Sequence, residues 1–185
     1  MKTEKKIKTI MAIDPSINYC GVAIFGAKSK ELHKAILVTP DKITKRDGEF
    51  YDKAYSVFRQ VQHMQEEHNV QAIVCELPDH WSIAGHAARE SGSIEKLAFM
   101  CGLFYQMRDD VDKFVFTLPR GWKGQLSKEV TKNRIKSTYC GKKSWQYSED
   151  EWEELNHNVC DAIGIGHWSI YGRVSCISTR SWMNF

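Results

Sequence analysis

The spacing of hydrophobic residues changes along this chain from the period of strands to the period of helices. Near the N-terminus it predicts three strands, Lys8–Asp14, Cys20–Phe25 and Glu31–Val38. Short segments with turn residues separate these strands, and Pro40 ends the third. We therefore predict that the first three strands form an antiparallel meander.

Helices and strands alternate in the rest of the chain, where apolar residues first recur at helical spacing. The predicted elements are helix Phe50–His68, strand Val70–Leu77, a helix from about Ala84 to Met107, strand Lys113–Leu118, basic helix Lys128–Tyr139 and helix Glu149–Tyr171. A helix between two strands favours parallel pairing of those strands. The whole pattern predicts a mixed α/β sheet, an antiparallel meander plus parallel strands, with helices on both faces.

The composition fits one globular domain. Of the 185 residues, 42% are hydrophobic and 26% are charged, and we expect one domain over residues 1–172 with a tail of unknown role at 173–185. The apolar run after the basic N-terminus, Thr9–Ile13, is too short for a signal peptide or a membrane span. The six cysteines form no CxxC pair, which favours a reducing compartment. Together these features predict a soluble, cytoplasmic protein with no membrane partner.

Positive charge is concentrated in one segment, although the net charge of the chain is only +3. Eight basic residues stand there against one acid, Glu129: Arg120, Lys123, Lys128, Lys132, Arg134, Lys136, Lys142 and Lys143. Four aromatic residues lie between them: Trp122, Tyr139, Trp145 and Tyr147. Cations with interleaved rings are typical of a surface that binds a polyanion such as nucleic acid. A solvated basic helix face is the alternative reading.

Three apolar stretches carry the candidate chemistry because each meets a carboxylate, at Asp14, Glu76 and Asp161. Asp14 and Glu76 each stand at the C-terminal end of a predicted strand, and if the two strands are parallel neighbours the acids lie side by side. Two like charges so close favour a divalent cation between them. Alternatively, the two acids are unrelated and face water.

Asp161 is the only polar side chain in the apolar stretch from Val159 to Gly166, so it needs a partner. On the same predicted helix, His157 and Asn158 precede it by four and three residues and can share its face. An asparagine offers a carbonyl oxygen and a histidine a ring nitrogen to a metal ion. Both residues are also ordinary at a helix start or on a surface.

With these motifs in view, the sequence resembles the RuvC-type Holliday junction resolvases of the ribonuclease H-like superfamily, in particular their phage-encoded relatives. The stretches that carry the resemblance are IDPSINYCGVAIF, AIVCELP, LPRGWKGQLSKEVTKNRI and HNVCDAIGIG. It implies a five-stranded ribonuclease H-like sheet and a homodimer that binds a four-way DNA junction. It also implies paired nicks made with Mg²⁺, or Mn²⁺ as a substitute, in a bacterial or phage-infected cell.

The resemblance assigns Asp14, Glu76 and Asp161 as metal-binding acids. Asn158 stands where the family commonly has a further acid, and a different spacing in some members would select His157 instead. A neutral ligand there should weaken a second metal ion, which puts the rate or the metal preference in question rather than the fold.

The resemblance also implies residues that contact DNA. Lys123 and Lys128 match the lysines that grip the scissile phosphate, and Trp81 matches an aromatic residue that stacks near the crossover. The remaining expected DNA contacts come from the basic segment: Arg120, Trp122, Lys132 and Arg134. The apolar helix that contains Phe99 is a candidate for dimerisation, although core packing explains its pattern nearly as well.

Two other classes of function remain compatible with these residues, and a third fits poorly. A ribonuclease H-like enzyme that cuts RNA in hybrids, or a debranching nuclease, would use the same acids. A protein that binds junctions without cutting them would keep the basic segment. An actin-like ATPase fits poorly, because the turn after Asp14 has a single glycine, Gly21, where a glycine-rich phosphate loop is required.

Overall fold

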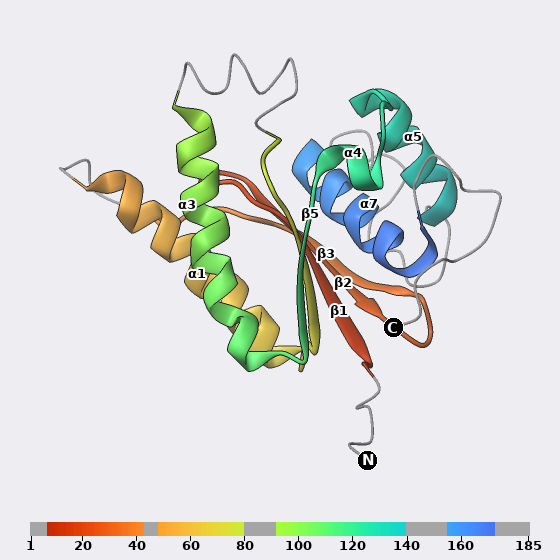
Figure 1. Ribbon diagram of the computed structural model, residues 1–185, viewed down its shortest axis with the longest axis horizontal. Helices are drawn as coiled ribbons and strands as arrows, with labels where there is room; N and C mark the ends of the chain where they lie inside the picture. The colour runs from red at the N-terminus through yellow and green to blue at the C-terminus, as the bar shows by residue number, and fades with distance from the viewer. Residues whose placement is uncertain (1–6, 43–47, 80–91, 140–154, 173–185) are drawn as a thin grey trace.

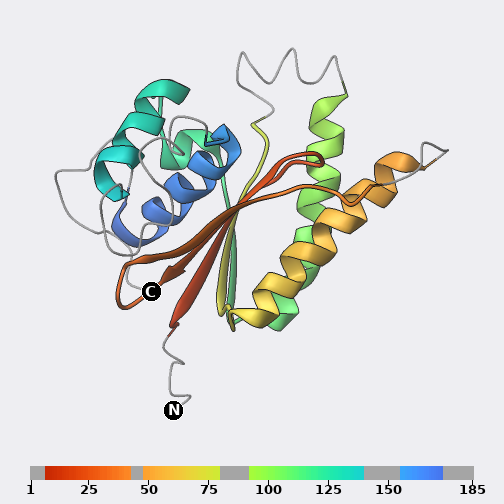
Figure 2. The same ribbon diagram turned by 180° about the vertical axis from the view of Figure 1, so that it is seen from behind.

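The computed structural model describes residues 7–42, 48–79, 92–139 and 155–172, which form a central sheet with helices on both of its faces (Figures 1 and 2). Some predictions fall outside these ranges. They concern Trp81, the start of the helix predicted from Ala84, the basic and aromatic residues Lys142, Lys143, Trp145 and Tyr147, the segment 149–154 and the tail 173–185.

The sheet has five strands in the order β3-β2-β1-β4-β5. They are β1 (Thr9–Asp14), β2 (Cys20–Gly26), β3 (Leu32–Val38), β4 (Ala72–Glu76) and β5 (Lys113–Thr117). β2 pairs antiparallel with β1 and β3, whereas β4 pairs parallel with β1 and β5. The predicted meander and the predicted parallel strands are both confirmed, and every strand boundary lies within two residues of its prediction.

Helices cover the two faces of the sheet in separate groups (Figures 1 and 2). One face carries α1 (Glu49–Glu67) and α3 (Ser93–Tyr105), which continues into the 3₁₀ helix η1 (Gln106–Asp110). The other face carries α4 (Pro119–Trp122), α5 (Lys128–Tyr139) and α7 (His157–Tyr171). Among the helices described, none combines the length and the hydrophobicity that crossing a membrane requires.

Each face of the sheet has its own apolar layer. In β1, Ile10 and Ala12 belong to the layer under α7, whereas Met11 and Ile13 belong to the layer under α1 and α3. Successive side chains of a strand point to opposite faces, so a strand covered on both sides must be apolar at every interior position. Asp14 is therefore the point at which β1 leaves the core.

The last helix begins later than predicted. Leu155 and Asn156 lie before it, and the side chain of Asn156 accepts a hydrogen bond from the backbone N–H of Asn158 at 2.9 Å. An asparagine that accepts such a bond caps the N-terminus of a helix. The prediction of a helix from Glu149 is wrong at Leu155 and Asn156, because this cap starts the helix at His157.

Candidate active site

Asp14 and Glu76 lie side by side at one edge of the sheet. β1 and β4 are parallel neighbours, and their register pairs Ile13 with Cys75. The next residue in each strand is the acid, so both carboxylates stand at the C-terminal ends of adjacent strands. This is the edge at which open α/β sheets bind ligands.

α7 carries Asp161 to the same edge because glycines let the helix lie close on β2. A Cβ on Gly21 would stand 2.0 Å from the main-chain oxygen of Asn158. On the helix itself, a Cβ on Gly166 would stand 2.1 Å from the ring of Phe25. The close approach of α7 to β2 thus requires a residue without a side chain at Gly21 on the strand and at Gly166 on the helix.

The three acids are close enough to influence one another's charge. Burial raises the pKa of Asp14 well above its ordinary value of 3.8, and the charges of Glu76 and Asp161 raise it further. Asp161 is only 7% exposed. Three carboxylates, from β1, β4 and α7, therefore lie near enough to one edge of the sheet to influence one another's pKa.

Glu76 is held by two other elements of the fold. The indole Nε1–H of Trp122, the last residue of α4, donates to its Oε2 at 2.5 Å. The thiols of Cys75 and Cys101 donate to its main-chain oxygen at 3.5 and 3.4 Å. Burial raises the pKa of Glu76 from 4.5 to about 7, although the charge of Lys123 and the indole bond act in the opposite direction.

Asp161 has a cationic partner. Its Oδ2 lies 3.1 Å from Nζ of Lys123, in an ion pair whose two side chains are largely buried. The charge of Lys128, at the start of α5, lowers the pKa of Asp14 and Glu76, which places this second lysine near the acids as well. Both lysines that the resemblance assigns to phosphate contact thus lower the pKa of Asp14 and Glu76.

The two candidates for a fourth ligand stand at the start of α7 and differ in their surroundings. Asn158 is partly buried, and its side-chain amide donates to the main-chain oxygen of Tyr19. His157 is exposed overall. The part of its side chain that the protein covers, together with the charge of Lys128, lowers its pKa below 6.5. A neutral imidazole keeps a lone pair that a metal ion can accept.

The basic segment corrects one prediction. Trp122 is completely buried, so its ring cannot stack on a base, and the expectation that it contacts DNA is wrong. Tyr139 is also a core residue, 3% exposed, with its hydroxyl 2.9 Å from Nδ1 of His167. The predicted DNA-contacting cations lie at or near the surface of α4 and α5: Arg120 and Lys128 are exposed, and Lys132 and Arg134 are partly exposed.

The donor set fits a hard divalent cation. Within the described ranges, no three side chains of His, Cys, Asp or Glu lie close enough together to form a metal-binding group as they stand. Two of the three acids have protein partners instead, since Trp122 binds Glu76 and Lys123 binds Asp161. Burial, and after it the negative charges of Glu76 and Asp161, raise the pKa of Asp14 despite the two lysines nearby, and a divalent cation would offset both effects. Carboxylate oxygens are the ligands that Mg²⁺ and Mn²⁺ prefer.

Without divalent cations, we expect Glu76 to make the free energy of unfolding fall as the pH rises from about 4.5 to about 7. The folded protein keeps the Glu76 proton up to about pH 7, whereas the unfolded chain releases it near 4.5, so rising pH favours the unfolded state in this window. Urea denaturation in a chelator at pH 5 and pH 7.5 measures the effect.

Histidine side chains ordinarily change charge in this pH range as well. Comparison with Glu76→Gln removes their contribution, because it is the same in both proteins. The stability of the variant relative to the natural protein should grow with pH between these two values. A difference that stays constant would contradict the prediction.

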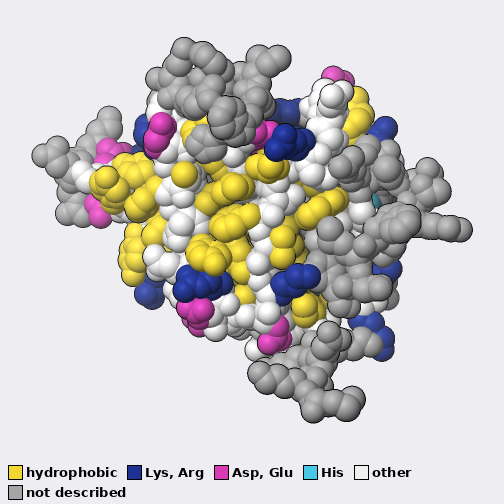
Figure 3. Space-filling view, in the orientation of Figure 1, with side chains coloured by type: hydrophobic (Ala, Val, Ile, Leu, Met, Phe, Trp, Pro, Cys, Tyr) yellow, Lys and Arg dark blue, Asp and Glu magenta, His cyan; other side chains and the backbone are white. Residues whose placement is uncertain are grey.

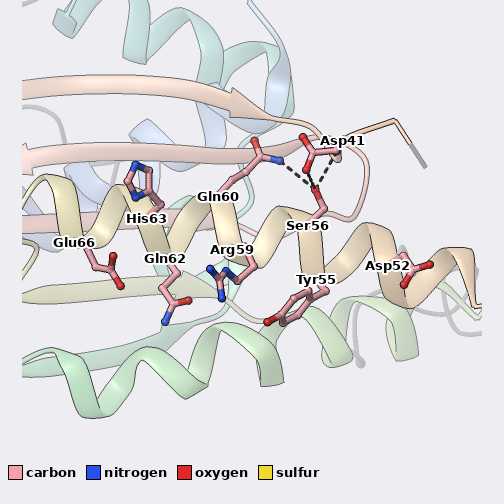
Figure 4. Close-up of a pocket in the computed structure, with 9 residues that line it drawn as sticks. All are labelled: Asp41, Asp52, Tyr55, Ser56, Arg59, Gln60, Gln62, His63 and Glu66. Atoms are coloured by element: carbon pink, nitrogen blue, oxygen red, sulfur yellow. Dashed lines mark hydrogen bonds between the residues drawn. The ribbon is translucent and has the colours of Figure 1, made fainter. Parts of the chain in front are cut away.

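A cavity of about 620 Å³ lies elsewhere, along the outer surface of α1 (Figure 4). Ser56 donates to Oδ2 of Asp41 at 2.7 Å and accepts from Gln60, which ties the segment after β3 to the helix. Of the predicted site residues that the structure describes, none lines this cavity. The acids at the sheet edge, and not this cavity, remain the candidate site.

No protein-family model matches the sequence, and no curated protein matches it. Solved structures do. Thermus thermophilus RuvC in complex with a Holliday junction substrate is 16% identical, with a TM-score of 0.61 over 91% of this chain and 96% of the other. A second structure of Thermus thermophilus RuvC is 14% identical, with a TM-score of 0.57 over 87% and 92% of the two chains.

A eukaryotic structure extends the likeness. The yeast mitochondrial Holliday junction resolvase Ydc2 is 10% identical, with a TM-score of 0.54 over 90% of this chain and 80% of the other. Across the three structures the shared region includes at least 87% of this chain and at least 80% of the other, so the likeness concerns the whole arrangement of sheet and helices. The chain therefore has the ribonuclease H-like fold of the RuvC-type Holliday junction resolvases.

Proposed function

We propose that this protein is a RuvC-type nuclease that resolves four-way DNA junctions by metal-dependent hydrolysis of phosphodiester bonds. The observation that carries the proposal is the convergence of Asp14, Glu76 and Asp161 beside Lys123 at the strand-end edge of a RuvC-like fold. Three acids supply metal ligands, and the lysine supplies a cation for a phosphate. The cytoplasm, where branched DNA is available, is the expected compartment.

The three acids would hold Mg²⁺ or Mn²⁺, with Asn158 or His157 as a further ligand. The bound ions supply an activated water and stabilise the charge that develops on the phosphate and on the departing 3′ oxygen. Asp14 and Glu76 orient the ions from the rigid strand ends, which keeps the reacting groups in place without reorganisation.

In the proposed mechanism, Lys123 has two alternative partners, Asp161 and the scissile phosphate. Its ammonium neutralises Asp161 in the structure as it stands. If a divalent cation were held by that carboxylate, the ammonium of Lys123 would be available to bind the scissile phosphate, a charge-assisted contact. Lys128 lies at the exposed start of α5 and is positioned to contact the same backbone. Arg120, Lys132 and Arg134 extend the cationic surface along the arms of the junction, with Trp81 stacking at the crossover.

Cleavage of synthetic DNA tests the function directly. An end-labelled four-way junction, a linear duplex of the same sequence and an RNA/DNA hybrid would be incubated with the protein in Mg²⁺ or Mn²⁺. We expect symmetric paired nicks in the junction alone. Preferential cutting of the hybrid would move the protein to the ribonuclease branch of the fold, and junction binding without cutting in either metal would overturn the nuclease assignment.

We also propose a homodimer, which paired nicks in a two-fold symmetric junction require. The exposed side of α3 carries Ala98, Phe99, Gly102 and Tyr105 at helical spacing. Phe99 is 38% exposed and packs against Tyr51, which is 60% exposed, with ring centroids 5.4 Å apart. In Figure 3, hydrophobic side chains gather over the part of this face where α3 and β5 lie. An apolar stripe of this kind fits a second copy of the chain.

Phe99→Glu should convert the dimer to a monomer, because it puts a charge in the centre of the apolar stripe. Light scattering after size exclusion measures the mass in solution. Val130→Glu is the matched control, since Val130 is a similarly exposed apolar residue, 41% exposed, on α5. A dimer that survives Phe99→Glu and dissociates with Val130→Glu would place the interface on the opposite face of the sheet.

A further inference from the structure

We infer that Trp122 is a positioning residue for Glu76, and that its indole N–H holds one carboxylate oxygen and leaves the other available to a divalent cation. This inference rests on the proposed function, because it concerns how the same site binds divalent cations. It assigns a role to a residue that sequence patterns place among the DNA contacts.

The contact is direct and shielded from water. Nε1 of Trp122 lies 2.5 Å from Oε2 of Glu76, and the side chain of Trp122 is completely buried. The protein makes room for the ring on α7, where a Cβ on Gly164 would stand 2.4 Å from the indole carbon Cζ3. The indole is therefore fixed by packing against the helix that carries Asp161, and its N–H has little freedom to point elsewhere.

One short helix thus serves two of the three acids. Trp122 ends α4 and binds Glu76, while the next residue, Lys123, binds Asp161 at 3.1 Å. The two contacts differ in kind. A divalent cation can displace the ammonium of Lys123, because both are positive and compete for the same oxygen, whereas a neutral indole N–H adds no positive charge to the site and can stay bound to Glu76 beside a metal ion.

The opposite side of Glu76 is held as well. Cys101, on α3, donates its thiol hydrogen to the main-chain oxygen of Glu76 at 3.4 Å. The backbone of this acid is therefore tied to one helical layer and its carboxylate to the other. Hydrogen-bond partners that orient a ligand in this way typically contribute 10- to 100-fold to metal affinity or activity.

Trp122→Phe separates positioning from packing, because it keeps an aromatic ring under α7 and removes only the donor. We expect Mn²⁺ to bind about tenfold more weakly to this variant in a calorimetric titration, while the thermal unfolding midpoint in chelator changes little. Saturating Mg²⁺ should restore most of the cleavage rate, since the defect lies in metal affinity. Trp168→Phe is the matched control, as Trp168 packs against the same apolar layer from α7, and it should bind Mn²⁺ within about twofold of the natural protein.

A spectroscopic readout tests the contact in the unaltered protein. In a ¹H–¹⁵N spectrum, the indole signal that disappears in Trp122→Phe identifies Trp122 among the six tryptophans. We expect this signal to shift when Mg²⁺ is added to the natural protein and to stay unchanged when Mg²⁺ is added to Asp14→Asn. If Trp122→Phe fails to fold, selective labelling with the other five tryptophans replaced one at a time identifies the same signal.

The outcomes distinguish this inference from the proposed function. If the natural protein binds no Mn²⁺, or if Asp14→Asn binds it equally well, the proposed metal site is wrong and the positioning role fails with it. If Mn²⁺ binding requires Asp14 but is equal in Trp122→Phe and Trp168→Phe, and the indole signal ignores Mg²⁺, the metal site stands and the positioning role of Trp122 is overturned.

Discussion

Asp14→Asn should lower the rate of junction cleavage by more than about 100-fold. Asp14 lies beside Glu76 at the strand-end edge and shares the negative field of Asp161, so in the proposed mechanism it is a direct metal ligand. Residues that only orient such ligands contribute 10- to 100-fold, and a direct ligand should contribute more. An amide is nearly the same size as a carboxylate but lacks its charge, so the change removes affinity for the cation and leaves the packing in place.

The measurement is single-turnover cleavage of an end-labelled junction in Mg²⁺. The folded structure should become more stable in chelator at neutral pH, because one of three mutually repelling acids is gone. Asp41→Asn provides the control, since Asp41 is a carboxylate of the same fold that hydrogen-bonds Ser56 beside α1, and its rate should match that of the natural protein. Full activity in Asp14→Asn would remove Asp14 from the mechanism.

The sheet was predictable because its signals are local. The apolar runs that end at Asp14 and Glu76 are strands buried on both faces, and the segment just before the second has helical spacing, which favours a parallel strand after it. That β4 pairs with β1 in particular was only a condition of the prediction, and the sheet order supplies it. The start of α7 was less predictable. Apolar spacing continues on both sides of Asn156, and only its side-chain bond to the backbone of Asn158 decides where the helix begins.

The site was predictable as far as it depends on strand ends. Once β1 and β4 are known to pair, the neighbouring positions of Asp14 and Glu76 follow, and Asp161 is marked by its polarity in an apolar helix. The role of Trp122 was not predictable, because a tryptophan among lysines has the same local pattern whether it stacks on a base or fills a core. Its burial depends on Gly164, which is distant in the sequence and meets it only in the folded chain.

Lys123 shows the same limit in another form. Its place in a basic segment predicts a phosphate contact, and the segment contains no acid near enough in sequence to suggest a partner. The structure pairs it with Asp161, from the last helix. A run of basic residues predicts that a surface is positively charged. Which carboxylate pairs with a given lysine depends on which elements the fold brings together.

Gly21→Ala should destabilise the fold by about 3 kcal/mol, at the upper end of the range for overpacked cores. The added Cβ would stand 2.0 Å from the main-chain oxygen of Asn158 and 2.4 Å from its carbonyl carbon. A main-chain group has no alternative rotamer, so α7 must move away from β2 to relieve the clash. Because α7 carries Asp161, we expect both the stability and the junction cleavage rate to fall.

Urea denaturation measures the stability, and cleavage at a temperature where the variant remains folded measures the separate effect on the site. Gly102→Ala is the matched control for the added methyl group, and its mass in solution is measured as well, because Gly102 lies in the proposed dimer stripe of α3. Gly102 lies on the exposed side of α3, and a Cβ there meets nothing within 4 Å, so alanine should be neutral or should stabilise the helix by up to about 1 kcal/mol. If Gly21→Ala is as stable and active as Gly102→Ala, the close approach of α7 to β2 does not determine the position of Asp161. If it folds but cuts slowly, the geometry of the three acids depends on this single glycine contact.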